Sequence, residues 1–245
     1  MPTEISQALA DQFALVSENC RACGICVKQC RFLTEHGTPK EISEFYCKHH
    51  ELLALDCSLC NLCAAVCPFD VDPARMFLEM RRETARKSET IVQNYRVIRS
   101  YEKRGASPRF SYYGFPVHCG TVFFPGCTLP GTRPDTTIKL FEYLREEMPT
   151  LGIVLDCCTK PSHDLGDEKF FGTMFDELRN YLLDHNIKKV IVACPNCYKV
   201  FQRYGDSLTV ISAYEELERD FQVNAINSDA PVTIHDPCAV RTEKA

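Results

Sequence analysis

The sequence lacks three features that would place it in common classes of protein. No stretch approaches the roughly 18 consecutive apolar residues of a membrane-spanning helix, and the N-terminus has neither the basic nor the apolar block of a secretory signal. A basic surplus is also missing, because 28 Lys and Arg oppose 33 Asp and Glu for a net charge of −5. This charge disfavours nucleic-acid binding. We therefore expect a soluble, cytoplasmic protein, either free or peripheral to a membrane complex.

Cysteine, in contrast, is abundant. The 16 cysteines among 245 residues are a smaller share than the roughly 8–10% of short disulfide scaffolds, and a chain of this length does not need disulfides for stability. Metal or redox chemistry is therefore the better explanation. Nine cysteines lie in residues 1–75, none in 76–118 and seven in 119–245. A cysteine-free connector thus separates two cysteine-rich regions.

The first region contains two four-cysteine runs with the spacing of bacterial ferredoxins, Cys-x2-Cys-x2-Cys-x3-Cys. In that spacing three thiolates bind one [4Fe–4S] cluster and the fourth binds the neighbouring cluster. The predicted ligands of cluster one are Cys20, Cys23, Cys26 and Cys67, and those of cluster two are Cys57, Cys60, Cys63 and Cys30. Zinc sites use two separated pairs and do not explain the third and fourth cysteines of each run.

Helical patterns surround these runs. Apolar residues recur at helical intervals from Ile5 to Val16 and from Ile42 to Leu53, and Thr38-Pro39-Lys40-Glu41 predicts a capping box. Asp72-Pro73 opens a further helix carrying Met76, Phe77 and Met80. We interpret Cys47, His49 and His50 as helix residues rather than ligands. An α-helical ferredoxin domain is predicted over residues 1–85.

A basic connector is predicted over residues 86–117. Ten Lys and Arg but only four Glu lie between Arg75 and Arg109, and Ile91, Tyr95, Ile98 and Tyr101 suggest an amphipathic helix ending near Gly105. The basic face could be a solvated surface, a docking surface or a positive counterweight to the clusters.

The second cysteine-rich region, residues 118–245, alternates strands with helices. Strands are predicted at 121–124, 151–155, 190–193, 208–211 and 232–234, with a helix carrying the stripe from Phe171 to Leu182. This alternation predicts an α/β domain with a mostly parallel sheet. Five cysteines fall just after strands: Cys127, Cys157, Cys158, Cys194 and Cys197. Because ligands of such sheets bind beyond the carboxyl ends of the strands, we expect the five thiols to converge.

The pattern Cys127, Cys157-Cys158, Cys194-Pro-Asn-Cys197, with Phe124-Pro-Gly before the first cysteine and Pro161 and Gly166 after the pair, resembles a cysteine-rich domain with a Cys-Cys-Gly motif. This domain occurs in heterodisulfide reductase and in the iron–sulfur subunit of glycolate oxidase. With two preceding ferredoxin motifs, the chain resembles the fused form of heterodisulfide reductase. The resemblance implies that the five cysteines form a catalytic site holding a non-cubane [4Fe–4S] cluster or zinc.

Three functions remain open at this point. The first is an oxidoreductase subunit that passes electrons through two [4Fe–4S] clusters to the five-cysteine site, where a disulfide is reduced. The second is a relay between a flavin-dependent 2-hydroxy acid dehydrogenase and a quinone or another carrier. The third is a non-enzymatic assembly module. No Gly-x-Gly-x-x-Gly fingerprint is present, so we expect partner subunits that include a flavin-containing donor and a membrane- or quinone-linked subunit.

Two positions depart from the family pattern. Thr159 stands where the family has glycine, which affects how closely the backbone approaches a bound group. His235-Asp-Pro-Cys238 looks like the opening of a second motif, which the seven remaining residues are too few to complete. We therefore expect a chain that ends mid-domain, has been cut, or is completed by another polypeptide.

Lys160 and His163 could donate protons to leaving thiolates, or be a solvated lysine and a helix-capping histidine.

Overall fold

The computed structural model describes residues 5–45, 53–87, 94–220, 231, 233 and 236–241. The chain forms two compact units, one comprising Met1–Arg96, Pro161–Phe170 and Arg241–Ala245, the other Val97–Lys160 and Phe171–Val240. No helix within the described ranges is long and apolar enough to span a membrane. Some sequence predictions lie outside these ranges, namely those for Cys47, His49, His50, Leu52, Ile91 and most of the strand at 232–234 with His235.

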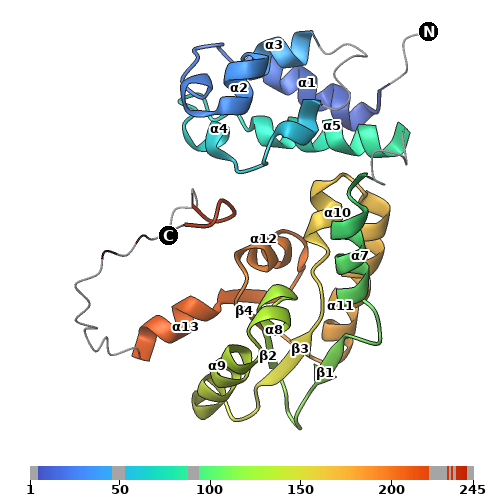
Figure 1. The fold of residues 1–245 in the computed structure, drawn as a ribbon, viewed down its shortest axis with the longest axis vertical. Helices are drawn as coiled ribbons and strands as arrows, with labels where there is room; N and C mark the ends of the chain where they lie inside the picture. Colours follow the sequence, from blue (N-terminus) through green and yellow to red (C-terminus); the bar gives the residue numbers. More distant parts are fainter. Residues whose placement is uncertain are drawn as a thin grey trace. The chain divides into compact units, whose positions relative to one another are not determined.

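The first unit is built mainly of short helices (Figure 1). They are α1 (Gln7–Asn19), α2 (Arg31–His36), α3 (Pro39–Glu44), α4 (Leu62–Ala65) and α5 (Pro73–Lys87), with 3-10 turns η1 (Val27–Gln29) and η3 (Leu53–Asp56). Leu9 and Val16 of α1 and Met76, Phe77 and Met80 of α5 are buried in one core. The predicted apolar faces of both helices are confirmed.

Side-chain caps fix where two of these helices begin. Ser6 caps α1 by accepting a hydrogen bond from the Leu9 N–H. At α3 the Glu41 N–H donates to the Thr38 hydroxyl, while the Thr38 N–H donates to the Glu41 carboxylate. This is the capping box predicted from the sequence, and it sets the direction of the chain between the two cysteine runs.

The second unit contains a five-stranded sheet in the described residues. Its strands are β1 (Tyr112–Gly114), β2 (Thr121–Phe124), β3 (Gly152–Leu155), β4 (Lys189–Val192) and β5 (Thr209–Ser212), in the order β1-β3-β2-β4-β5. All neighbours are parallel except β1, which pairs antiparallel with β3 at the edge. The predicted α/β architecture and the four described parallel strands are confirmed. The strand β1 was not predicted and lies within the predicted connector.

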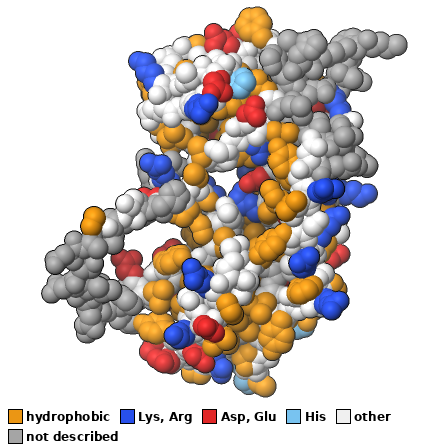
Figure 2. Space-filling view, in the orientation of Figure 1, with side chains coloured by type: hydrophobic (Ala, Val, Ile, Leu, Met, Phe, Trp, Pro, Cys, Tyr) orange, Lys and Arg blue, Asp and Glu red, His pale blue; other side chains and the backbone are white. Residues whose placement is uncertain are grey.

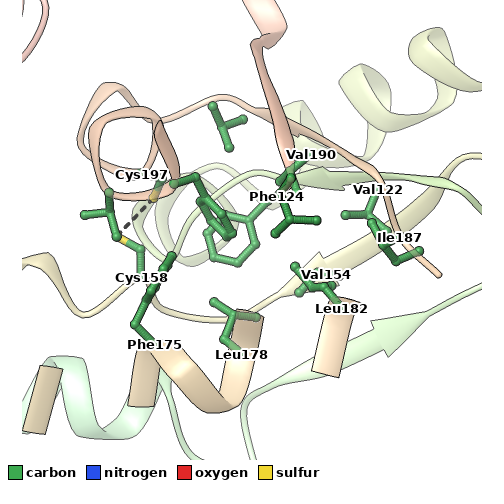
Figure 3. Close-up of a cluster of buried hydrophobic side chains, with 14 of the residues drawn as sticks. Val122, Phe124, Val154, Cys158, Phe175, Leu178, Leu182, Ile187, Val190 and Cys197 are labelled. Atoms are coloured by element: carbon green, nitrogen blue, oxygen red, sulfur yellow. Dashed lines mark hydrogen bonds between the residues drawn. The ribbon is translucent and has the colours of Figure 1, made fainter. Parts of the chain in front are cut away.

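Helices cover both faces of this sheet. They are α9 (Pro134–Glu147), α11 (Glu168–Asp184), α12 (Pro195–Tyr204) and α13 (Ala213–Asp220), with α7 (Arg96–Gly105), α8 (Thr128–Thr132) and α10 (Lys160–Asp164) as further helices of the chain. Val122 and Phe124 of β2 pack with residues of α11 and α12, as Figure 3 shows, whereas Phe123 packs against α9. This alternation is the two-residue period of a strand buried on both faces.

The helix α7 agrees with the predicted amphipathic helix that ends near Gly105, and most of its apolar residues are exposed. Val97, Ile98 and Tyr101 are 76%, 47% and 48% exposed, and the buried residue of α7 is Glu102. Figure 2, which has the orientation of Figure 1, shows hydrophobic and basic side chains next to one another where Figure 1 labels α7.

The strand order creates a switch point at β2. The strand β3 lies on one side of β2 and β4 on the other, so the segments that follow β2 and β4 diverge. In parallel sheets a crevice opens at the carboxyl ends of such strands, where ligands bind. The segments that follow β2, β3 and β4 are those that carry the five cysteines.

Candidate metal centres

Two cavities of the first unit gather the predicted cluster ligands. One is lined by all four cysteines assigned to cluster one, which are Cys20, Cys23, Cys26 and Cys67. The other is lined by all four assigned to cluster two, which are Cys30, Cys57, Cys60 and Cys63. Each cavity therefore combines three cysteines of one run with the last cysteine of the other. Cys63 borders both cavities.

The two runs also share an unusual backbone pattern. In the first run Ala22 and Gly24 have φ of 49° and 74°, and at the equivalent positions of the second run Leu59 and Asn61 have φ of 52° and 61°. Left-handed conformations are costly for residues with a Cβ, and they concentrate at functional sites. In the second run the turn lets the Leu59 N–H donate to the Cys57 sulfur at 3.4 Å.

Burial opposes ionisation of several of these thiols. It raises the pKa of Cys57 to about 11, and it also raises the pKa of Cys26 and of Cys63. A bound metal cation reverses this effect, because thiols that coordinate a metal are deprotonated. The chemistry of the two sets of thiols therefore fits [4Fe–4S] clusters, whose irons are held by cysteine thiolates.

Arg81 is a residue of this unit whose role the sequence did not reveal. Arg81 is 7% exposed, and its guanidinium donates to three backbone carbonyls, those of Ala54 at 2.9 Å, Asp164 at 2.6 Å and Cys57. Burial lowers the pKa of Arg81, and the charge of a Cys57 thiolate opposes that shift. A fixed positive charge thus lies beside one predicted ligand. In the sequence Arg81 is only one of ten basic residues in its region.

The second unit brings the five strand-end cysteines together. The Cys197 and Cys158 sulfurs are 3.3 Å apart (Figure 3), and Cys157 donates a hydrogen bond to Cys127. Cys194 accepts a hydrogen bond from Cys197. Cys157, Cys158 and Cys197 are buried, whereas Cys127 and Cys194 are partly exposed. These contacts lie just beyond the carboxyl ends of β2, β3 and β4.

Two of these thiols ionise easily because their neighbours donate to them. The hydrogen bond from Cys157 lowers the pKa of Cys127 to about 7, and the one from Cys197 lowers the pKa of Cys194 to about 6. The same hydrogen bonds raise the pKa of each donor, Cys157 and Cys197. The charge of Lys160 further lowers the pKa of Cys194, which places this predicted proton donor near the site.

Two residues that the sequence did not single out, Asp156 and Tyr113, hold the backbone next to the Cys157-Cys158 pair. Asp156 accepts a hydrogen bond from the Cys157 N–H at 2.6 Å, and its other oxygen accepts one from the Tyr113 hydroxyl. In the sequence, Asp156 is visible only as an acidic residue before the cysteine pair. Its partner Tyr113 lies on β1, which has three residues and is too short to be predicted from its pattern.

Three further residues lie outside the five-cysteine set: His163, Cys238 and Cys119. His163 is 8% exposed, and its ring Nδ1 lies 2.8 Å from an Asp164 carboxylate oxygen. Cys238 is exposed, and Cys119 lies on the segment before β2, where its sulfur contacts the Thr121 carbonyl. Within the described residues, no group of three or more Cys, His, Asp or Glu side chains forms a site for a single metal ion.

Comparison with known proteins identifies the first cysteine-rich region. Residues 19–72 match a family described as a 4Fe-4S dicluster domain, a range that includes all eight cysteines of the two runs. Searches of curated proteins and of solved structures found no match. The chain therefore carries an iron–sulfur dicluster domain, and its chemistry is that of iron–sulfur electron transfer.

Proposed function

We propose that this chain is the iron–sulfur subunit of a heterodisulfide reductase-like oxidoreductase. Electrons would pass through two [4Fe–4S] clusters in the first unit to the five-cysteine site of the second, where a disulfide is reduced. The observation that carries the proposal is the convergence of five cysteine sulfurs at the carboxyl edge of the sheet. Five separately buried structural cysteines would not need a common position.

The cysteines that line each of the two cavities are the ligands that we propose for each cluster. Cys20, Cys23, Cys26 and Cys67 would hold one cluster and Cys57, Cys60, Cys63 and Cys30 the other, because each set lines one cavity. The five thiols Cys127, Cys157, Cys158, Cys194 and Cys197 would hold a non-cubane [4Fe–4S] cluster. Five thiolates exceed the four that a cubane cluster binds, which favours an irregular cluster.

Reduction of a disulfide consumes two electrons and two protons and yields two thiols. A bound iron–sulfur cluster supplies electrons one at a time. The protein residues would hold this site and manage its protons. Asp156 fixes the Cys157 backbone, and Lys160 lies close enough to Cys194 to affect its pKa. Lys160 could therefore deliver a proton to a leaving thiolate. The electrons would come from an external donor, for which we propose a flavin-containing partner subunit.

Anaerobic purification with the natural partners, followed by metal and sulfide analysis and low-temperature EPR, tests the metal content. We expect the iron of two ferredoxin-type clusters plus a further EPR signal that disappears in Cys157→Ser. The matched control is Cys119→Ser, because Cys119 is a partly buried cysteine outside the five-thiol set. Zinc in place of the additional iron would contradict a cluster at the five-cysteine site.

Activity assays then test the reaction. The complete complex with a reduced dye should reduce at least one of a panel of disulfides, and Cys157→Ser should abolish that turnover. If no disulfide is turned over, while a flavin-dependent dehydrogenase partner drives quinone reduction through the chain, the disulfide reductase assignment is wrong and the chain is a relay.

A further inference from the structure

Thr159 combines two unfavourable features directly after the cysteine pair. Its side chain is fully buried, at 0% exposure, and its φ is +51°. A left-handed backbone is unusual for a β-branched residue, because the Cβ substituents crowd the adjacent carbonyl. The residue that avoids this strain is glycine, yet the sequence has threonine here.

The hydroxyl of Thr159 adds a second cost. No residue that the structure describes provides a hydrogen-bond partner for its oxygen Oγ1. Burying a hydroxyl without a partner is unfavourable, and such groups are rare in folded proteins. Among the described residues, this is the only buried hydroxyl without a hydrogen-bond partner.

The turn itself does not require a hydroxyl. Leu59 occupies the same place two residues after Cys57, with φ of 52°, and its N–H donates to the Cys57 sulfur. The Thr159 N–H likewise donates to Cys157 and so lowers the pKa of that thiol. A residue with an apolar side chain therefore makes the same backbone turn beside a predicted cluster ligand. The hydroxyl of Thr159 is an addition to this arrangement.

We propose that the Thr159 hydroxyl donates a hydrogen bond to a sulfur atom of the iron–sulfur group held by the five cysteines. This inference rests on the proposed function of that site. The two residues before Thr159 in the chain, Cys157 and Cys158, are buried members of the five-cysteine set, so a sulfur-rich group held by that set would lie beside this turn. A hydrogen bond to a ligand or sulfide sulfur stabilises the more negative, reduced state of a cluster. Thr159 would thus raise the reduction potential of this site above the value obtained with a residue that lacks the hydroxyl.

The test compares Thr159→Val and Thr159→Ser in the complete, metal-loaded protein by EPR-monitored redox titration under argon. Valine keeps the branched shape without the hydroxyl, and serine keeps the hydroxyl. We expect the midpoint potential of the five-thiolate signal to fall in the valine variant and to stay near the wild-type value in the serine variant. The two ferredoxin-type signals of the same sample serve as internal references and should not move.

Two further variants guard against a folding artefact. Thr159→Ala is the second variant without a hydroxyl, because Ala22 adopts φ of 49° two residues after Cys20. It should lower the potential as valine does. Thr137→Val is the matched control, since Thr137 is also buried but its hydroxyl donates to the Arg133 carbonyl at 3.0 Å. It should leave all three signals unchanged.

The possible failures can be told apart. If the wild-type protein shows the third signal but the valine and alanine variants share its potential, the inference about Thr159 is wrong and the proposed function stands. If the wild-type protein shows no third signal, both are overturned.

Discussion

At the scale of single residues, the cysteine sites contain left-handed backbone conformations at residues whose side chains do not predict them. Ala22, Leu59, Asn61 and Thr159 all have positive φ and all follow predicted ligands within two residues. Such conformations bring backbone N–H groups toward sulfur, as at Leu59 and Cys57. Their shared position indicates that local strain is the cost of directing amide dipoles at the thiolates.

Cross-ligation makes a prediction for single cysteine substitutions. Cys30→Ser should damage the cluster bound by the second run, and Cys67→Ser the cluster bound by the first, because each side chain lines the other run's cavity. Iron content and the two EPR signals measure the effect. Cys238→Ser is the control, since Cys238 is exposed and lies outside both cavities. Damage confined to the cluster of the mutated run would contradict the assignment.

Gly126→Ala should impair the five-cysteine site selectively. Gly126 has φ of +80°, and a Cβ there would lie 3.2 Å from both the Cys194 Cβ and the Cys197 sulfur. The left-handed backbone alone should cost alanine roughly 1–2 kcal/mol. Chemical denaturation and EPR should show a less stable second unit and a weakened third signal with intact ferredoxin signals. Gly120→Ala is the control, because a Cβ there meets nothing within 4 Å. An equal response in both variants would argue against close packing at Gly126.

Arg81→Met should affect both stability and potential. The substitution leaves three carbonyls without their charged donor, and each buried hydrogen-bonding group left unsatisfied costs about 1–3 kcal/mol. The loss of a positive charge beside Cys57 should also lower the potential of the cluster in the second-run cavity. Denaturant unfolding and redox titration measure the two effects. Arg31→Gln is the control, because Arg31 forms an exposed ion pair with Glu35. Equal shifts in both cluster potentials would contradict a local effect of Arg81.

At the scale of helices and strands, the sequence predicted those elements that are determined by the spacing of apolar residues or by capping and turn residues. The capping box at Thr38 and the parallel strands were recognisable because those signals are local. The strand β1 was missed, since Tyr-Tyr-Gly is too short for an alternating pattern and is held by pairing with β3. The amphipathic helix α7 was predicted, but its contact with the five-cysteine site was not, because the hydrogen bond from the Tyr101 hydroxyl to the Cys127 carbonyl is a tertiary contact. The role of Arg81 follows from tertiary contacts, which no local signal encodes.

The contact between α1 and α5 should make the first unit sensitive to acid. Glu83 of α5 accepts from the Ser6 N–H at 3.2 Å and pairs with Lys87 and Arg86. Burial raises the pKa of Glu83, but the hydrogen bonds from Lys87 and Ser6 outweigh it and hold the pKa below its ordinary value of 4.5. The ionised carboxylate therefore stabilises the fold above pH 4.5, and this contribution is lost as the pH falls through the lowered pKa.

Glu83→Gln should accordingly lose about 1–3 kcal/mol of stability near neutral pH. The difference from the wild type should shrink as the pH falls below 4.5, where the wild-type carboxylate becomes protonated. Denaturant unfolding at several pH values measures both effects. Glu35→Gln is the control, because Glu35 is a fully solvated partner of Arg31, and its unfolding midpoint should change little. A pH-independent loss in Glu83→Gln would point to packing rather than charge.

At the scale of the whole molecule, the two units place their cysteines differently. In the first unit Cys63 is part of the apolar core and five other cysteines pack against it, among helices as short as the four residues of α4. In the second unit the core lies between the sheet and its helices, and the five thiols sit where strands end. Cys158 and Cys197 also belong to the core of the second unit, but the strands and the helices that cover them supply the other members of that core.

Removal of the metal should therefore unfold the first unit and spare the second. Short isolated helices are marginal in water, and metal binding to such small domains is part of their folding free energy. In the described residues the larger core of the second unit has fifteen buried members, of which only two are cysteines, and its parallel strands need no metal to pair. After treatment with a chelator and an oxidant under argon, hydrogen exchange should show loss of protection in α1 and α5 but not in β2 and β4. The untreated protein in the same buffer is the control, and loss of protection in all four elements together would show instead that both units fold as one cooperative block.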